Sequence, residues 1–259
     1  MGLLAVASGK GSPGVTTTAL VLAAVWPRRA LVAECDPAGG DLVYRVAAEH
    51  GGPLDPNLGM LSLAADARRG LSPDQVWPHV QRMGGGLDVL TGIATAEQSA
   101  GLTGSWSTLG RAFEALPGAD VVADCGRLGA DPAPADLMRH AAMVLLVARS
   151  TPEQIAQARD RAVALSQRLH GGSPLGLPPI GVLLITDPRR AVRMTDQTNE
   201  ILSASGANAV VVGALADDPA GAEQLSGRRS GRADKSLLVR SARQVALDLQ
   251  ARLGLTGVG

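Results

Sequence analysis

Short apolar runs alternate with helical patterns along the chain, and this alternation limits the fold more than any other feature. Seven runs are predicted as strands: Leu3–Ala7, Leu31–Cys35, Leu87–Leu90, Val121–Asp124, Met143–Val147, Gly181–Ile185 and Ala209–Val212. Several of them are apolar at every position, which is typical of parallel strands covered on both faces. Such strands, joined by helices, predict an α/β fold with a doubly wound, mostly parallel sheet flanked by helices.

Helical patterns fill the intervals between these runs. They lie near Val15–Val25, Pro73–Met83, Ser105–Leu116, Pro152–Leu169, Ala191–Ser205 and Ser236–Leu253. The Gly- and Pro-rich stretches between them are short, and the sequence shows no internal repeat or long linker. We therefore expect residues 1–259 to form a single domain. In a sheet of this kind the ligand binds at the carboxyl ends of the strands.

Composition excludes several classes of protein. Lys and Arg number 24, as do Asp and Glu, so the formal net charge is zero and a nucleic-acid coat protein is disfavoured. The 2% of aromatic residues leave little material for base-stacking platforms. Two cysteines cannot build a disulfide framework, and no apolar run approaches the ~20 residues of a membrane-spanning helix. We expect a soluble, cytoplasmic protein.

A glycine-rich loop follows the first predicted strand directly. From Ser8 to Thr18 the chain runs SGKGSPGVTTT. Backbone N–H groups in such a turn, together with the N-terminus of the following helix, form a cradle for a phosphate group. Thr16 and Thr17 fall in the first helical turn, where a hydroxyl group can hold Mg²⁺ beside a phosphate. The alternative is an ordinary strand–helix turn whose threonines only cap the helix.

Two kinds of phosphate site fit this loop. Gly9–Gly14 matches the G-x-G-x-x-G pattern of dinucleotide-binding folds, and Glu34 stands about twenty residues later, where a carboxylate binds the ribose. The same stretch has the glycine spacing of a P-loop, G-x-x-x-x-G-K-[ST], with Thr16 in the hydroxyl position. Val15 occupies the lysine position of that pattern. A dinucleotide-binding oxidoreductase and an NTPase-like protein are therefore both open at this point.

The loop resembles that of the deviant P-loop NTPases of the MinD/ParA type, in the SIMIBI class. That family carries K-G-G-x-G-K-[ST]-T after its first strand, and residues 10–17 here read KGSPGVTT. Lys10 matches the early lysine, while Ser12 and Val15 depart from the pattern. Further segments resemble the family in the same order: ECDP at 34–37, DVVADCG at 120–126, STPE at 150–153 and VGALADD at 212–218. A dinucleotide-binding fold predicts none of these later segments.

The resemblance implies a set of site residues. It places nucleotide on Gly9, Lys10, Gly11, Ser12, Pro13, Gly14, Val15, Thr16 and Thr17, and Mg²⁺ among Thr16, Asp36 and Asp124. Asp36 would orient the attacking water, and Lys10 would reach the nucleotide of a second copy across a homodimer. The cofactors implied are ATP or ADP and Mg²⁺, and the dimer would present a surface to a further protein partner.

Valine at position 15 has a chemical consequence. A P-loop lysine neutralises charge on the β- and γ-phosphates, and removing one such donor typically lowers a rate by about 10²–10³-fold. Lys10 and Lys235 are the only lysines of the chain, so the helix after the loop holds no substitute. We expect a degenerate ATPase with weak or no hydrolysis, acting in positioning of a chromosome, a septum or a polar secretion or pilus machinery. The alternative is an active ParA-like ATPase.

Six basic residues gather in the last part of the chain. They are Arg228, Arg229, Arg232, Lys235, Arg240 and Arg243. ParA-like relatives bind DNA nonspecifically through basic patches, so the resemblance implies a salt-sensitive DNA surface here. The simpler interpretation is a packing helix with a solvated arginine face. Membrane binding is less expected, because the stripe Leu238–Leu253 lacks bulky aromatic residues.

Overall fold

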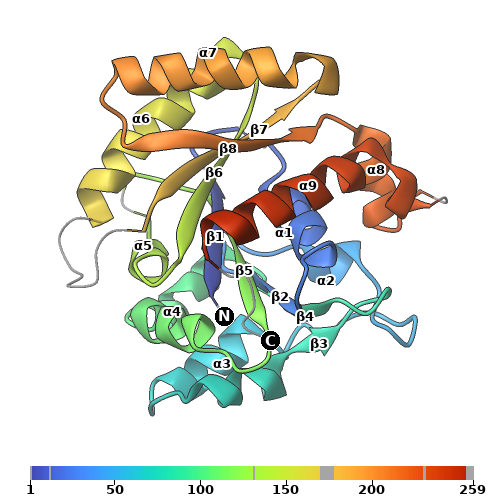
Figure 1. Cartoon of the computed structure of the whole chain (residues 1–259). Coiled ribbons are helices and arrows are strands. Elements are labelled where there is room, and N and C mark those ends of the chain that lie inside the picture. Colours follow the sequence, from blue (N-terminus) through green and yellow to red (C-terminus); the bar gives the residue numbers. More distant parts are fainter. Residues whose placement is uncertain (1, 12, 131, 170–177, 230–231, 255–259) are drawn as a thin grey trace.

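An eight-stranded sheet runs through the centre of the protein in the order β3-β4-β2-β5-β1-β6-β7-β8 (Figure 1). The computed structural model describes residues 2–11, 13–130, 132–169, 178–229 and 232–254. The strands are β1 (Leu3–Ser8), β2 (Ala30–Glu34), β3 (Gln81–Arg82), β4 (Asp88–Leu90), β5 (Asp120–Arg127), β6 (Met143–Arg149), β7 (Ile180–Thr186) and β8 (Ala209–Ala216). Every neighbouring pair is parallel except β3 with β4. The predicted doubly wound, mostly parallel sheet is confirmed.

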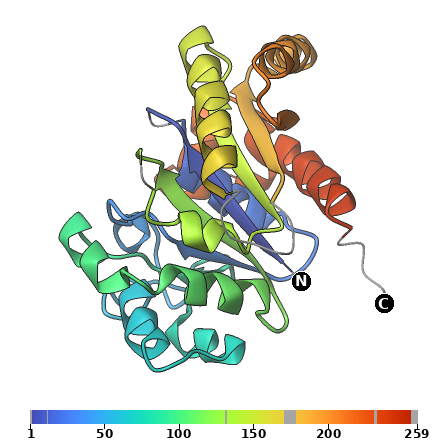
Figure 2. The same ribbon diagram turned by 90° about the vertical axis from the view of Figure 1, so that its left-hand side faces the viewer.

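Helices cover both faces of this sheet (Figures 1 and 2). One face carries α1 (Val15–Ala24) and α9 (Leu237–Arg252). The other carries α3 (Met60–Ala67), α4 (Trp106–Glu114), α5 (Ala135–Met138), α6 (Pro152–Leu169) and α7 (Ala191–Ala204). Shorter elements complete the chain: α2 (Leu42–Arg45), α8 (Pro219–Leu225) and the 3₁₀ helices η1 (Pro73–His79), η2 (Ala96–Leu102), η3 (Pro188–Arg190) and η4 (Ala233–Lys235).

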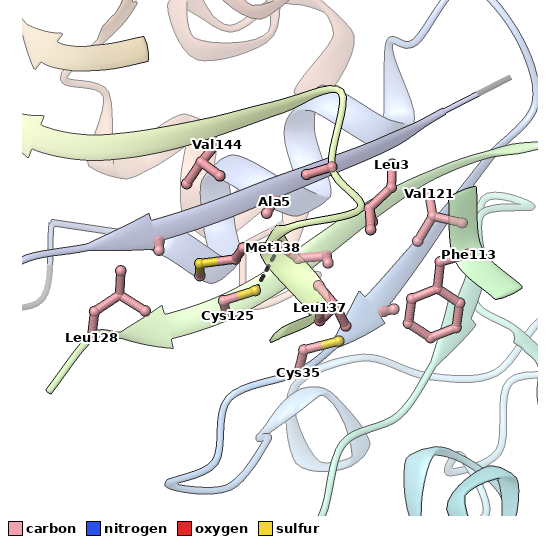
Figure 3. Packing of buried hydrophobic residues seen from close by; sticks show 14 of the residues in the cluster. Leu3, Ala5, Cys35, Phe113, Val121, Cys125, Leu128, Leu137, Met138 and Val144 are labelled. Carbon is pink, nitrogen blue, oxygen red and sulfur yellow. Dashed lines mark hydrogen bonds between the residues drawn. The ribbon is translucent and has the colours of Figure 1, made fainter. Parts of the chain in front are cut away.

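Side-chain alternation along β5 separates two hydrophobic cores. Successive residues of a strand point to opposite faces of the sheet. Val121, Ala123 and Cys125 accordingly face the core beneath α4 and α5, which we call the first core. Val122 faces the core beneath α1 and α9, the second core. Figure 3 shows the first core, where the fully buried Phe113 ring lies beside Val121.

The predicted strands are all present, and one predicted helix is wrong. Pro73–Met83 was expected to be an α-helix, but η1 ends at His79 and β3 follows. Pro78 lies inside η1 and has no N–H group for an α-helical hydrogen bond, which explains why the helical pattern does not continue. Helix α3 escaped prediction because its eight residues give only a short periodic pattern.

Asp120 ties the amino-terminal ends of the central elements together. Its carboxylate accepts hydrogen bonds from the Gly2 N–H group and the Trp26 indole Nε1–H group, both at 2.9 Å. The Arg28 Nε atom lies 3.5 Å from the same carboxylate. Asp120 is buried, so these donors stand in for the water that the carboxylate loses on folding. The contacts fix the segment after α1 against the start of β5.

Replacing Asp120 by alanine should lower the free energy of unfolding by about 2–4 kcal/mol, because two buried N–H donors would lose their acceptor. Urea unfolding followed by circular dichroism measures this change. Asp120→Asn is the matched control: it keeps one carbonyl oxygen for these donors and should cost less. An Asp120→Ala protein as stable as the wild type would show that this tie contributes nothing.

Candidate functional site

The glycine-rich loop joins β1 to α1 and leaves the N-terminus of α1 uncapped. Gly14 precedes the helix with φ 103° and ψ 42°, a left-handed conformation that glycine adopts without strain. Within the described part of the chain no side chain caps this end of α1, and its first turn holds no acidic residue. The N–H groups of the first turn therefore present the positive end of the helix dipole to the loop. This arrangement fits a phosphate group.

The loop packs closely against α6, and this contact explains its first glycine. A side chain at Gly9 would meet the Gln157 carbonyl oxygen at 3.1 Å. Gly11 has φ 76°, so a side chain there would be strained. Lys10 between them is exposed, while Pro13 and Val15 are buried. Ser12 lies outside the described residues.

Thr16 and Asp124 form a hydroxyl–carboxylate pair beside this cradle. The Thr16 side chain hydrogen-bonds to the Asp124 carboxylate, which also accepts the Gly126 N–H group at 3.0 Å. Burial raises the pKa of Asp124 to about 6, and these hydrogen bonds partly oppose the shift. Mg²⁺ takes such oxygens, usually one or two carboxylates completed by phosphate and water. Within the described ranges no group of three or more His, Cys, Asp or Glu side chains could hold a metal by itself.

Asp36 joins this pair from the neighbouring strand end. Its Oδ1 atom accepts the Ala38 N–H group at 2.8 Å. The carboxylate lies over Gly126, where any added side chain would overlap it. Burial raises the pKa of Asp36, and the repulsion between Asp36 and Asp124 contributes to the raised pKa of Asp124. The structure therefore brings together the three residues predicted around Mg²⁺.

The carboxylate of Glu34 accepts hydrogen bonds from backbone N–H groups. Its Oε1 atom accepts the N–H groups of Asp41 and Leu42, at 2.9 and 3.0 Å, and its Oε2 atom accepts the Gly92 N–H group at 2.8 Å. Only 3% of Glu34 is exposed, and Gly40 and Gly92 enclose its side chain. Its carboxylate is committed to these three donors, so the geometry does not support the ribose-binding role of a dinucleotide site.

A cavity of about 260 Å³ opens beside the loop, at the carboxyl ends of β6, β7 and β8. Pro13 and Gly14 form its wall toward the loop, and Ile185 and Leu238 add apolar surface. Arg149 and Asp217 line it as an ion pair, with 2.8 Å between Nη1 and Oδ2. A ligand with phosphates on the loop would have room here for an attached sugar and base. Arg149 was not among the predicted site residues; its signal in the sequence is its position at the end of a buried apolar strand.

Solved structures align with nearly the whole chain, although no protein-family model and no curated protein matches it. The cell division ATPase MinD of Pyrococcus furiosus aligns with a TM-score of 0.71 and 16% identity, over 97% of this chain and 100% of that one. A ParA family ATPase from Chlorobium tepidum TLS aligns with a TM-score of 0.69 and 17% identity, over 95% and 98%. MinD from Pyrococcus horikoshii OT3, complexed with Mg-ADP, aligns with a TM-score of 0.68 and 16% identity, over 99% of both chains. This chain has the MinD/ParA fold.

The six basic residues lie at one corner of this MinD/ParA fold, where α8, η4 and α9 contact one another. All six are exposed. Arg232 forms an ion pair with Asp234 at 3.0 Å, so part of the positive charge is neutralised. The same corner reaches the cavity, because Ala222 of α8 and Leu238 of α9 line it. Among the described residues, no helix is both long and apolar enough to cross a membrane.

Glu34 should make the stability of the protein depend on pH. Burial raises the pKa of Glu34 from 4.5 to about 7, against the effect of its three N–H donors. Between these values the folded protein holds a proton that the unfolded chain has released. The free energy of unfolding should therefore fall as pH rises from 4.5 to 7, by at most roughly 1.4 kcal/mol per pH unit from this residue.

Urea unfolding at pH 5, 6, 7 and 8 tests this expectation. Glu34→Gln is the matched variant, because it keeps the size of the side chain and cannot titrate. Asp124 still titrates in both proteins, so the measurement is the difference between their slopes. A Glu34→Gln protein with the slope of the wild type would contradict the assignment.

Proposed function

We propose that the protein is a MinD/ParA-like switch that binds ATP or ADP with Mg²⁺ and hydrolyses ATP weakly or not at all. The observation that carries this proposal is the convergence of Thr16, Asp36 and Asp124 on the uncapped N-terminus of α1. The cavity of about 260 Å³ beside it gives room for the nucleoside. The Mg-ADP complex of a protein with the same fold supports the choice of ligand.

Each part of the site has a distinct task in this proposal. The backbone N–H groups of the loop and of the first turn of α1 bind the phosphates. Thr16 and Asp124 hold Mg²⁺, which neutralises phosphate charge when bound. Asp36, half-buried over Gly126, orients water toward the terminal phosphate. Lys10 is exposed on the loop and faces solvent, as a residue that reaches a second copy of the chain must.

Positioning of a chromosome, a septum or a polar secretion or pilus machinery is the cellular task we propose. A nucleotide-bound homodimer would create a surface for a protein partner that the apo monomer lacks. Binding of nucleotide, rather than its turnover, would then carry the signal. Weak hydrolysis follows from Val15, which is 8% exposed and packs in the second core without any charge to offer a phosphate.

Phosphate release from ATP by the wild type and by Val15→Lys tests the proposal. We expect the wild type to bind Mg-ATP with little turnover, and Val15→Lys to gain turnover because one missing donor accounts for about 10²–10³ in rate. Val15→Met is the matched control, since it adds length without charge and should gain nothing.

Two other results would overturn parts of the proposal. Turnover in the wild type that Lys10→Ala abolishes would show an active ParA-like ATPase in which Lys10 carries the charge. Failure of both the wild type and Val15→Lys to bind nucleotide would refute the switch itself.

Nonspecific DNA binding is a second candidate function, favoured by the exposed basic corner of α8, η4 and α9. We expect the logarithm of the DNA association constant to fall linearly with the logarithm of salt concentration. Changing Arg240 and Arg243 together to glutamine should reduce that slope by roughly 2, because each phosphate contact contributes about 0.9. Fluorescence anisotropy with a duplex of random sequence measures it. An unchanged slope would make α9 a packing helix with a solvated face.

A further inference from the structure

β5 changes its pairing with β1 immediately after Asp124. Val6 pairs with Asp124, but Ser8 pairs with Arg127, so β5 contains one residue more than β1 between these two pairs. The irregularity includes Gly126, whose φ of 60° lies in the left-handed region. A bulge of this kind redirects the side chains that follow it.

The bulge turns Arg127 toward the face of the sheet that carries the phosphate cradle. Before it, Cys125 faces the first core and Asp124 the opposite side. After it, Leu128 is 2% exposed and again belongs to the first core, as Figure 3 shows for both Cys125 and Leu128. Arg127 pairs with Ser8, which follows Ala7 of the first core, and both therefore fall on the opposite face, with Asp124 and α1. An unbroken strand would have sent Arg127 to the face of Cys125.

Arg127 lies beside the start of the glycine-rich loop, and no carboxylate of the described residues neutralises its charge. Its side chain is exposed and forms no ion pair with a carboxylate of the described part of the chain. Two nearby arginines are already engaged: Arg149 pairs with Asp217 at 2.8 Å, and Arg161 donates to the Gly129 carbonyl at 2.6 Å. Burial raises the pKa of Asp36, and the positive charge of Arg127 partly opposes this shift, which is consistent with a guanidinium close to this carboxylate.

We propose that Arg127 binds the terminal phosphate of the nucleotide, and so contributes positive charge to nucleotide binding without taking over the transition-state role of a P-loop lysine. The inference rests on the proposed function, because it assumes that the loop holds nucleotide. Arg127 pairs with Ser8, the residue directly before the loop, and neighbours Gly126, on which Asp36 lies. A triphosphate directs its last phosphate toward the residues that hold the metal and orient the water. A guanidinium matches phosphate oxygens in bidentate geometry.

In this position Arg127 would strengthen the binding of a nucleoside triphosphate relative to that of a diphosphate. A diphosphate leaves the position beside Asp36 and Arg127 empty, while the loop and α1 bind its phosphates as before. Removing Arg127 should therefore weaken ATP binding and leave ADP binding nearly unchanged. A merely structural arginine would affect both nucleotides alike.

Calorimetric titration with Mg-AMPPNP and Mg-ADP tests the assignment in the full chain. We expect Arg127→Gln to weaken Mg-AMPPNP binding by about 10- to 100-fold, the range of a charge-assisted hydrogen bond, and to change Mg-ADP binding by less than about 3-fold. Arg127→Lys should lie between the wild type and Arg127→Gln. Arg111→Gln, which removes an exposed charge from α4, is the matched control and should bind as the wild type does.

A double variant with Val15→Lys and Arg127→Gln tests whether charge is what Arg127 contributes. Lysine at position 15 would restore the preference for Mg-AMPPNP if charge is what Arg127 supplies. Equal effects of Arg127→Gln on both nucleotides, or no effect on either, would overturn the role of Arg127 while the nucleotide switch stands. A wild type that binds neither nucleotide would overturn the switch and the inference together.

Discussion

β5 lies between β1 and β2 in the sheet and pairs with both of them as a parallel strand. Glu34 and Asp124 are partners in this register, and the Cys35 N–H group donates to the Asp124 carbonyl at 2.7 Å. The glycine-rich loop follows β1 and Asp36 follows β2, so the register brings both to the carboxyl end of β5. A slip of one residue between these strands would turn Asp124 into the first core and separate it from Thr16. The site depends on this pairing more than on any single contact within it.

Buried carboxylates serve two purposes in this protein, and their partners distinguish them. Asp120 and Glu34 are each fully engaged by donors of the same chain, and they hold the amino and carboxyl ends of the central strands in place. Asp124 and Asp36 instead lie beside the glycine-rich loop, where the Thr16 side chain is hydrogen-bonded to Asp124, and burial raises the pKa of both, as it does that of Glu34. Burial disfavours the charged forms of Asp124 and Asp36, and a Mg²⁺-bound nucleotide would stabilise them.

The parts of the fold that have a local signal are predictable from the sequence. Strands buried on both faces must be apolar throughout, so β1, β6 and β7 were visible as runs. The role of Glu34 was not visible, because one of its donors, Gly92, lies 58 residues away and contributes only a backbone N–H group. The face of the sheet on which Arg127 lies could not be predicted either, because it depends on a bulge between β5 and β1. Thr16 and Asp124 were predicted through their motifs, and the structure shows them in contact.

Nucleotide binding through Mg²⁺ at the carboxyl ends of the strands can be measured by calorimetric titration of the wild type with ATP, in Mg²⁺ and again in excess chelator. We expect one nucleotide per chain, with affinity that falls at least about tenfold when Mg²⁺ is removed, because Thr16 and Asp124 then lose the ion that links them to the phosphates. Binding that is equally tight in chelator would contradict the metal site, and no binding under either condition would contradict the nucleotide site itself.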